Sequence, residues 1–441
     1  MFYAFILPLV VYAIITCNAH LETDVTGLSK RDVGSMTFLS RWKADFQIGS
    51  EKDDISFYFD FDDSWNYLPV NFVGCNTSVS GTNEFSNSTT NATKNTCVFS
   101  TNFGDLTNLK SRYNSTLQTT ILTDKLIIGD YQVDGVDFVP LEYNDTIGFL
   151  GLGLPYQSID DYYNISDGSH KNFVQQLHQT GVIDSSILSL WLNPGNKSEG
   201  QFAFGGIDEA KYNGSLFRFP MVNSFAYLEH SKFLEIKMDS LLTSTMSFTQ
   251  PVGMSLNPSA LSTWFPQSYF EALVNALGGK YDEKHGGTSV HKKYLTLNEV
   301  VTFKFGNFNL SVPISSLVEE RLGKVYTTFV AGNIATLGLD ILQHAYIAID
   351  YDNNEVALGQ SKANALDSEK FVNATSNLSS ILLASGASET SLAIEMQLAL
   401  QSPALILFAS QRSYGSLSGN AAYTGPLMGL FGLIAGVLMA V

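Results

Sequence analysis

The sequence predicts a mainly β fold made of two similar lobes that face each other across a central cleft. Between residues 32 and 362, short alternating or β-branched runs recur with turn residues between them: SFYFDF, KLIIG, SILSLWL, QFAFGG, VTFKFG, AYIAIDY and EVALGQ. Helical spacing with a terminal glycine occurs in FVQQLHQTG (173–181) and SYFEALVNALGG (268–279). Strands therefore dominate, and helices are few.

An internal duplication supports the two lobes. FDFDDSWNYLP (59–69) is followed by IGFLGLGLP (147–155), and SLNPSALSTWFP (255–266) is followed by TLGLDIL (336–342). Each half offers an apolar strand, a polar turn, an aromatic residue, a proline and later an apolar strand with Leu-Gly. Two similar lobes would bring the two polar turns face to face.

Composition limits the possible partners. The chain has 441 residues, of which 45% are hydrophobic and 15% charged, enough for one large two-lobed unit or two domains. Its formal net charge is −17, and binding a phosphate backbone needs a clustered Lys/Arg surface. Nucleic acid is therefore not an expected partner.

The first residues favour a secreted protein. An apolar run ends at Cys17-Asn18-Ala19, which is typical of a signal peptide spanning residues 1–19, although the usual basic segment is missing. Residues 20–31 then form a short propeptide that ends in Lys30-Arg31, a pair that a processing enzyme could cut. The alternative interpretation is an ordinary exposed basic pair.

The C-terminal segment suggests a lipid anchor. After residue 362 the chain becomes rich in Ser, Ala and Asn, which predicts a weakly ordered stalk over residues 363–420. The tail, residues 421–441, ends in 15 uncharged residues, too short for a comfortable membrane span. Small residues before it are typical of a GPI-attachment signal, with the lipid on Asn420 or Gly419.

The cysteine and asparagine patterns also fit a protein of the secretory pathway. Once Cys17 is removed, Cys75 and Cys97 are left, and an oxidising compartment favours their disulfide. A closed loop of roughly 20 residues would contribute about 3 kcal/mol. Eleven sequons are candidate glycosylation sites: Asn76, Asn87, Asn91, Asn114, Asn144, Asn164, Asn196, Asn213, Asn309, Asn373 and Asn377.

Four segments resemble the pepsin-like aspartic proteases, and within them the GPI-anchored yeast yapsins. They are GFLGLGLP (148–155), SLWLN (189–193), GQFAFGGIDEAKYNGSLFRFP (200–220) and AYIAIDYDNNEVALGQ (345–360). The resemblance implies a bilobal fold with a central cleft, an N-terminal lobe over residues 32–206 and a C-terminal lobe over residues 207–362.

The catalytic motifs depart from that family's pattern. Gapless alignment on the prolines sets Asp60-Phe61-Asp62-Asp63 onto Asp-Thr-Gly-Ser, which retains Asp60, and sets Asn257-Pro258-Ser259-Ala260 onto Asp-Ser/Thr-Gly-Thr. Two neighbouring carboxyl groups share a proton in this mechanism, and an asparagine cannot replace one of them. The changed flanking residues predict the loss of the family's hydrogen-bond network, and Phe103 replaces the flap tyrosine.

The resemblance therefore implies a pseudoprotease, an inactive or impaired relative that binds a peptide or protein in its cleft and a membrane through its lipid. Two alternatives stay open: an active aspartic endopeptidase that uses Asp60 with Asp62 or Asp63, and a structural cell-wall mannoprotein. The three acids also have a plain interpretation as a solvated turn. The seven histidines show no metal-ligand spacing, so neither a metal nor a cofactor is expected.

Overall fold

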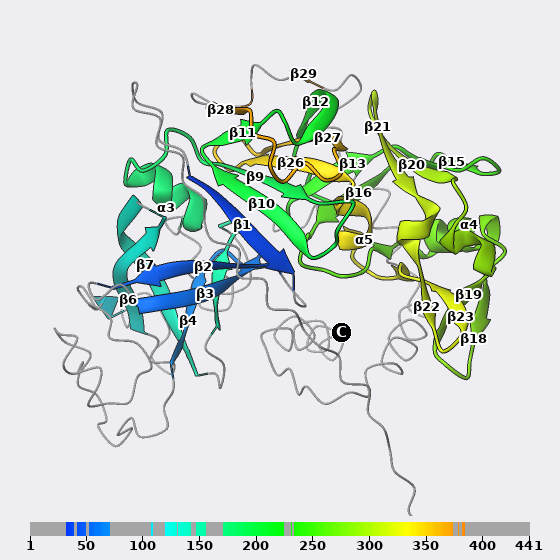
Figure 1. Cartoon of the computed structure of the whole chain (residues 1–441), viewed down its shortest axis with the longest axis horizontal. Coiled ribbons are helices and arrows are strands. Elements are labelled where there is room, and N and C mark those ends of the chain that lie inside the picture. Colours follow the sequence, from blue (N-terminus) through cyan, green and yellow to red (C-terminus); the bar gives the residue numbers. More distant parts are fainter. Residues whose placement is uncertain are drawn as a thin grey trace, which may run out of the picture.

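The computed structural model describes most of the predicted β body and little outside it. The described residues are 32–38, 42–49, 53–70, 107–108, 120–129, 131–142, 147–155, 171–224, 231, 233–373, 378 and 382–383. Within them the fold is mainly β, as predicted, and two lobes flank a shared sheet (Figure 1). No helix in these ranges combines the length and the hydropathy that crossing a membrane requires.

The N-terminal lobe is built from strands and one helix. Its elements are β1 (Asp32–Phe38), β2 (Trp42–Ile48), β3 (Asp53–Asp60), β4 (Asn66–Val70), β5 (Thr107–Asn108), β6 (Thr120–Ile128), β7 (Tyr131–Glu142), β8 (Ile147–Gly151), α3 (Phe173–Gln179), β9 (Ile187–Leu192) and β10 (Glu199–Phe204). β2 shows why such runs form strands, since Trp42, Ala44, Phe46 and Ile48 are buried while the residues between them are partly or fully exposed.

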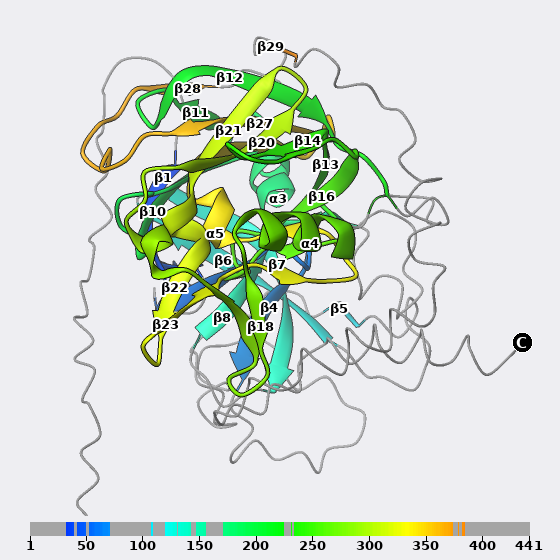
Figure 2. The same cartoon turned by 90° about the vertical axis from the view of Figure 1, so that its right-hand side faces the viewer.

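The C-terminal lobe contains more short strands, and α4 lies on its outer side (Figure 2). Its first elements are β11 (Gly206–Asp208), β12 (Tyr212–Pro220), β13 (Glu235–Met238), β14 (Ser240–Leu242), β15 (Ser247–Phe248), β16 (Val252–Leu256), β17 (Trp264–Phe265), α4 (Gln267–Ala276), β18 (Lys280–Asp282), β19 (Gly287–Val290), η2 (Lys292–Leu295), β20 (Val300–Phe305) and β21 (Phe308–Pro313). There follow η3 (Ile314–Leu317), β22 (Val318–Arg321), β23 (Lys324–Thr327), β24 (Val330–Ala331), β25 (Thr336–Leu337), α5 (Leu339–Leu342), β26 (Ala345–Asp350), β27 (Glu355–Ser361), β28 (Phe371–Asn373) and β29 (Leu382–Leu383).

One large sheet joins the two lobes. Its strand order is β29-β12-β27-β26-β9-β10-β1-β2-β3-β8-β4-β7-β6-β5, so β9 of the first lobe pairs with β26 of the second. All residues of β9 and β26 are buried, which explains why ILSLWL and AYIAID are almost uninterrupted apolar runs. The joining sheet is therefore part of the core.

The two expected helices form where the sequence places them. α3 begins after Asn172, which accepts the N–H of Gln175 and whose own N–H binds the Gln175 side chain, a capping box. Gly181 follows α3 with a φ of 72°, and Gly278 follows α4 with a φ of 64°. Both glycines adopt the left-handed conformation that commonly ends a helix.

The internal duplication is confirmed by strand pairing. β3 runs parallel to β8, and β4 lies antiparallel to the other side of β8. In the second lobe β16 runs parallel to β25, and β17 lies antiparallel to β25. A Cβ on Gly151 would lie 2.3 Å from the Ser64 backbone, and one on Gly338 would lie 2.5 Å from the Ser262 backbone. Each Leu-Gly strand thus passes directly beneath the polar turn of its own lobe.

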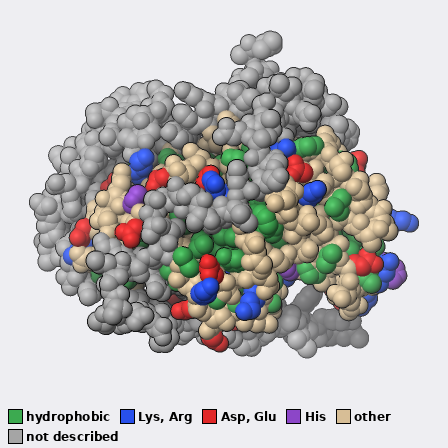
Figure 3. Space-filling view, turned by 90° about the horizontal axis from the view of Figure 1, so that it is seen from above, with side chains coloured by type: hydrophobic (Ala, Val, Ile, Leu, Met, Phe, Trp, Pro, Cys, Tyr) green, Lys and Arg blue, Asp and Glu red, His purple; other side chains and the backbone are tan. Residues whose placement is uncertain are grey.

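Charge is mixed on the face that Figure 3 shows. Hydrophobic side chains gather near the middle of the described surface, and acidic and basic side chains lie beside them. On this face Lys and Arg do not form one continuous field, in keeping with the net charge of −17.

Candidate active site

The first polar turn begins where β3 ends. Asp60 is the last residue of β3, and its carbonyl oxygen accepts a hydrogen bond from Leu152 N at 2.7 Å. Its carboxylate Oδ1 accepts the backbone N–H of Asp62 at 2.9 Å, the arrangement of an Asx-type turn. Asp60 is partly buried and Asp62 is exposed, so the turn presents the two carboxylates at different depths.

Asp63 is not the solvated turn residue that a plain interpretation expects. It is 4% exposed, its Oδ1 accepts Trp65 N at 3.0 Å, and its Oδ2 accepts the Tyr67 hydroxyl at 2.7 Å. Burial, and after it the nearby charge of Asp60, raises the pKa of Asp63 to about 7. From the sequence, Asp63 was only one of three neighbouring acids, because the burial of its side chain depends on the strand beneath the turn.

The second polar turn holds Asn257 in one orientation. Its backbone N–H binds Leu337 O at 3.1 Å, and its side-chain Oδ1 accepts Ser259 N at 3.0 Å and Ala260 N at 3.2 Å. With the oxygen occupied by two donors, the amide nitrogen points to the other lobe and donates to Asp62 Oδ2 at 2.7 Å. A carboxylate of one lobe therefore meets an amide of the other.

Two further bonds cross between the lobes at this point. Ser259 Oγ donates to Phe59 O at 2.7 Å, and Trp42 Nε1 donates to Pro258 O at 3.0 Å. Phe61 lies where the resemblance expects a threonine, and it is buried in the core. Phenylalanine lacks the hydroxyl of a threonine, and at this point the Ser259 hydroxyl supplies a hydrogen bond between the lobes.

Behind the second turn lies a buried carboxyl group that sequence reasoning missed. Thr263 Oγ1 donates to Asp340 Oδ1 at 2.6 Å and accepts Gly338 N at 2.9 Å, and Thr328 Oγ1 donates to Asp340 Oδ2 at 2.9 Å. Burial raises the pKa of Asp340 above its usual value. The sequence offered one signal for this buried carboxyl group, which is the position of Asp340 inside the apolar run TLGLDIL.

Several predicted sites lie outside the described residues. They are the signal peptide, Lys30-Arg31, Cys75, Cys97, Phe103, Gly419, Asn420 and the sequons at Asn76, Asn87, Asn91, Asn114, Asn144, Asn164 and Asn377. Three sequons are described with their side chains, and all three are exposed: Asn196, Asn213 and Asn309. Asn373 ends β28. Exposure is what a glycan acceptor requires.

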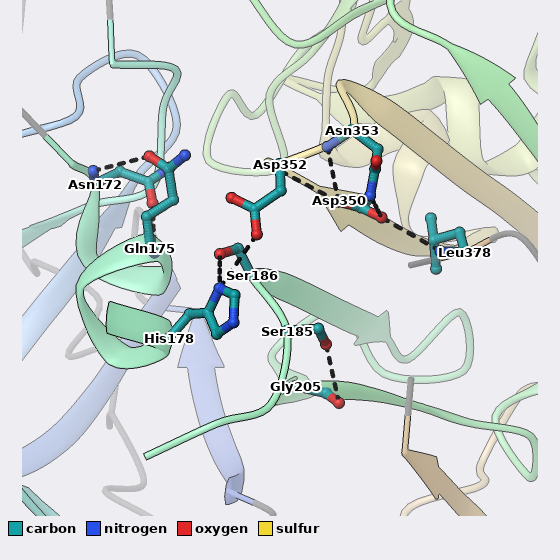
Figure 4. Close-up of polar contacts among 10 residues, drawn as sticks. All are labelled: Asn172, Gln175, His178, Ser185, Ser186, Gly205, Asp350, Asp352, Asn353 and Leu378. Carbon is teal, nitrogen blue, oxygen red and sulfur yellow. Dashed lines mark hydrogen bonds and ion pairs between the residues drawn. The ribbon is translucent and has the colours of Figure 1, made fainter. Parts of the chain in front are cut away.

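A serine, a histidine and an aspartate also meet away from the polar turns (Figure 4). His178 Nδ1 lies 3.0 Å from Ser186 Oγ and 3.2 Å from Asp352 Oδ2. A hydrolytic triad needs the serine and the acid on opposite ring nitrogens, whereas here both contact Nδ1, and Ser186 is 1% exposed. This group is therefore not a nucleophilic site. Among the described residues, no cluster of His, Cys, Asp and Glu suits a metal ion.

Comparison with known proteins defines the family. The chain belongs to the eukaryotic aspartyl proteases, whose family pattern matches residues 42–361. Aspartic proteinase 3 of Saccharomyces cerevisiae is 30% identical over 331 residues, which is 70% of this chain and 56% of that protein. Aspartic proteinase yapsin-3 of the same yeast is 28% identical over 54% of this chain and 50% of its own length.

A third relative and a solved structure agree with this assignment. Barrierpepsin of Saccharomyces cerevisiae is 29% identical over 57% of this chain and 46% of its own length. The chain thus spans about half the length of the curated relatives it matches. The crystal structure of an aspartic proteinase from Irpex lacteus matches with a TM-score of 0.55 at 16% identity, covering 78% of this chain and all of that one, which supports the fold.

Proposed function

We propose that this chain is a GPI-anchored cell-surface aspartic protease relative whose catalysis is impaired and whose cleft binds extended peptides. The sequence features of its two ends support secretion and anchoring. Relatives named secreted aspartic protease support the secretory route. Main-chain hydrogen bonding to an extended peptide does not require a pair of catalytic acids, so binding can outlast cleavage.

The observation that carries the proposal is the contact between Asn257 Nδ2 and Asp62 Oδ2 at 2.7 Å. At the position that the alignment gives to the second acid, the side chain is an amide that neither gives nor takes a proton near neutral pH. Both lone-pair directions of its oxygen are used by Ser259 N and Ala260 N. The amide therefore acts as a fixed donor, and no second acid arises from this position.

The turnover of a basic-residue peptide library in acid tests the proposal. We expect turnover about 100- to 10,000-fold below that of a two-acid enzyme, the usual contribution of general acid–base catalysis, while a labelled peptide still binds. Asn257→Asp should not restore activity, because Phe61 and Pro258 also differ from the family pattern. Asn275→Asp, which adds the same charge on the exposed side of α4, serves as the matched control.

A second candidate function is an active aspartic endopeptidase. The observation in its favour is that Asp63 has a pKa of about 7, raised in part by Asp60, so a proton is available beside Asp60. Pepstatin-sensitive turnover by the wild type that Asp60→Ala abolishes would establish this function and defeat the first. If the protein neither cleaves nor binds peptides, the structural cell-wall role is the one supported.

The anchor is tested separately. A phospholipase specific for GPI lipids should release the protein from the cell surface, and deletion of residues 421–441 should send it directly into the medium. Retention at the surface in both experiments would contradict lipid anchoring without affecting the argument about Asn257.

A further inference from the structure

The turn between β26 and β27 is a meeting point of the two lobes. Tyr351 N donates to Ser186 O at 3.1 Å, and the Tyr351 hydroxyl donates to Leu152 O at 2.5 Å. Asp352 Oδ2 lies 3.2 Å from His178 Nδ1 on α3. One turn of the C-terminal lobe thus contacts three separate segments of the N-terminal lobe.

Asp352 is presented by a well-supported turn. The buried carboxylate of Asp350 accepts Asp352 N at 3.2 Å, Asn353 N at 3.0 Å and Asn353 Nδ2 at 2.9 Å. Figure 4 shows the Asp352 side chain directed from this turn toward the imidazole of His178. The turn thus holds the backbone of Asp352 beside α3, while the His178 and Asp352 side chains stay 42% and 41% exposed.

Apart from Lys171, the charged groups on the neighbouring segments are acidic. α3, FVQQLHQ, contains no Asp, Glu, Lys or Arg, and Lys171 precedes it. The following segment, residues 180–186, contributes Asp184, and the turn contributes Asp350 and Asp352. Among the described residues, Asp352 is the acidic residue whose carboxylate lies within 4.0 Å of the His178 imidazole. Asp352 is therefore the carboxylate that pairs with this imidazole.

The same ring nitrogen faces two partners of different chemistry. A carboxylate accepts hydrogen bonds, whereas the Ser186 hydroxyl can also donate to a neutral nitrogen. When the imidazole gains a proton, Nδ1–H and the positive charge favour Asp352. When it loses that proton, the attraction of opposite charges is gone and Ser186 can serve as the donor. Histidine undergoes this change between about pH 5 and 8.

We propose that His178 and Asp352 form a tie between the two lobes whose strength depends on the protonation of the imidazole. The tie is close to the candidate active site through a short series of bonds, since Leu152 O accepts Tyr351 and Leu152 N binds Asp60 O. Loosening it leaves the joining sheet intact and permits more relative movement of α3 and the β26–β27 turn. This inference does not depend on catalysis or on peptide binding.

Hydrogen exchange of the full-length protein tests the tie. Wild type and Asp352→Asn are compared at pH 5 and at pH 8, with each comparison made at a single pH. At pH 5 we expect exchange in residues 171–186 and 345–361 to be about two- to fivefold faster in the variant, the range for a partly exposed ion pair. At pH 8 the two proteins should exchange equally in these segments.

The protein contains a matched control. His285 Nδ1 lies 3.1 Å from Asp282 Oδ2, so this imidazole–carboxylate pair stays within one hairpin, between β18 and β19, and Asp282 also pairs with Lys324. His285→Gln should alter exchange in that hairpin and leave residues 171–186 unchanged. Equal exchange of wild type and Asp352→Asn at pH 5, or the same difference at both pH values, would overturn the proposal. His178→Gln should reproduce Asp352→Asn.

Discussion

At the scale of single residues, the site depends on polar groups that are buried and fully engaged. Thr263 is the clearest case, because one hydroxyl accepts Gly338 N and donates to Asp340. Asp340 is 4% exposed, so its carboxyl group depends on protein partners. Removing one partner leaves a buried group without its hydrogen bond, and that loss exceeds the net contribution of an ordinary hydrogen bond.

Thr263→Val should therefore lower the free energy of unfolding by about 2 to 3 kcal/mol. The volume is nearly conserved, so the loss reports the hydroxyl. Urea unfolding followed by tryptophan fluorescence measures it. Thr336→Val is the control, since Thr336 lies on the adjacent β25 and makes one weaker contact, to Ile334 O at 3.4 Å. Similar unfolding midpoints for the two variants would show that Asp340 does not depend on this hydroxyl.

At the scale of elements, the sequence predicted the strands, helices and repeats that local residue patterns determine. The alternating runs became strands, both helices formed, and the repeated segments occupy equivalent positions in the two lobes. These features follow from periodicity, terminal glycines and the repeated Leu-Gly strand. Gapless alignment also identified the two polar turns that the structure brings together.

What the sequence could not predict depends on contacts between distant segments. Alignment placed Asp60 opposite Asn257, but in a turn without glycine it is Asp62 whose carboxylate meets the amide. The burial of Asp63 requires Tyr67 and the strand beneath, and the pairing of His178 with Asp352 joins residues 174 positions apart. Neither periodicity nor motif spacing contains information of that kind.

At the scale of the whole molecule, buried ionisable groups determine how stability depends on pH. Burial raises the pKa of Asp63 and of Glu235 to about 7 each, and raises that of Asp340 as well. The folded state therefore binds more protons than the unfolded state between about pH 4 and pH 7. Over that range each of these acids makes the protein less stable as the pH rises. His344 opposes them, because burial lowers its pKa to about 4 and its contribution is lost as the pH falls.

The three buried acids outnumber the histidine, so the free energy of unfolding should decrease from pH 5 to pH 8. Each proton bound only in the folded state changes that free energy by about 1.4 kcal/mol per pH unit, which gives a total decrease of several kcal/mol. Urea unfolding at pH 5, 6.5 and 8 measures this slope. Glu235→Gln should flatten it, since a neutral amide can accept the bond that Ser224 N donates to Glu235 Oε2 at 2.9 Å without ionising. Asp134→Asn, on an exposed part of β7, should leave the slope unchanged. A protein that becomes more stable toward pH 8 would show that these carboxyl groups are ionised and stabilised in the folded state, and the proton held beside Asp60 would then be absent.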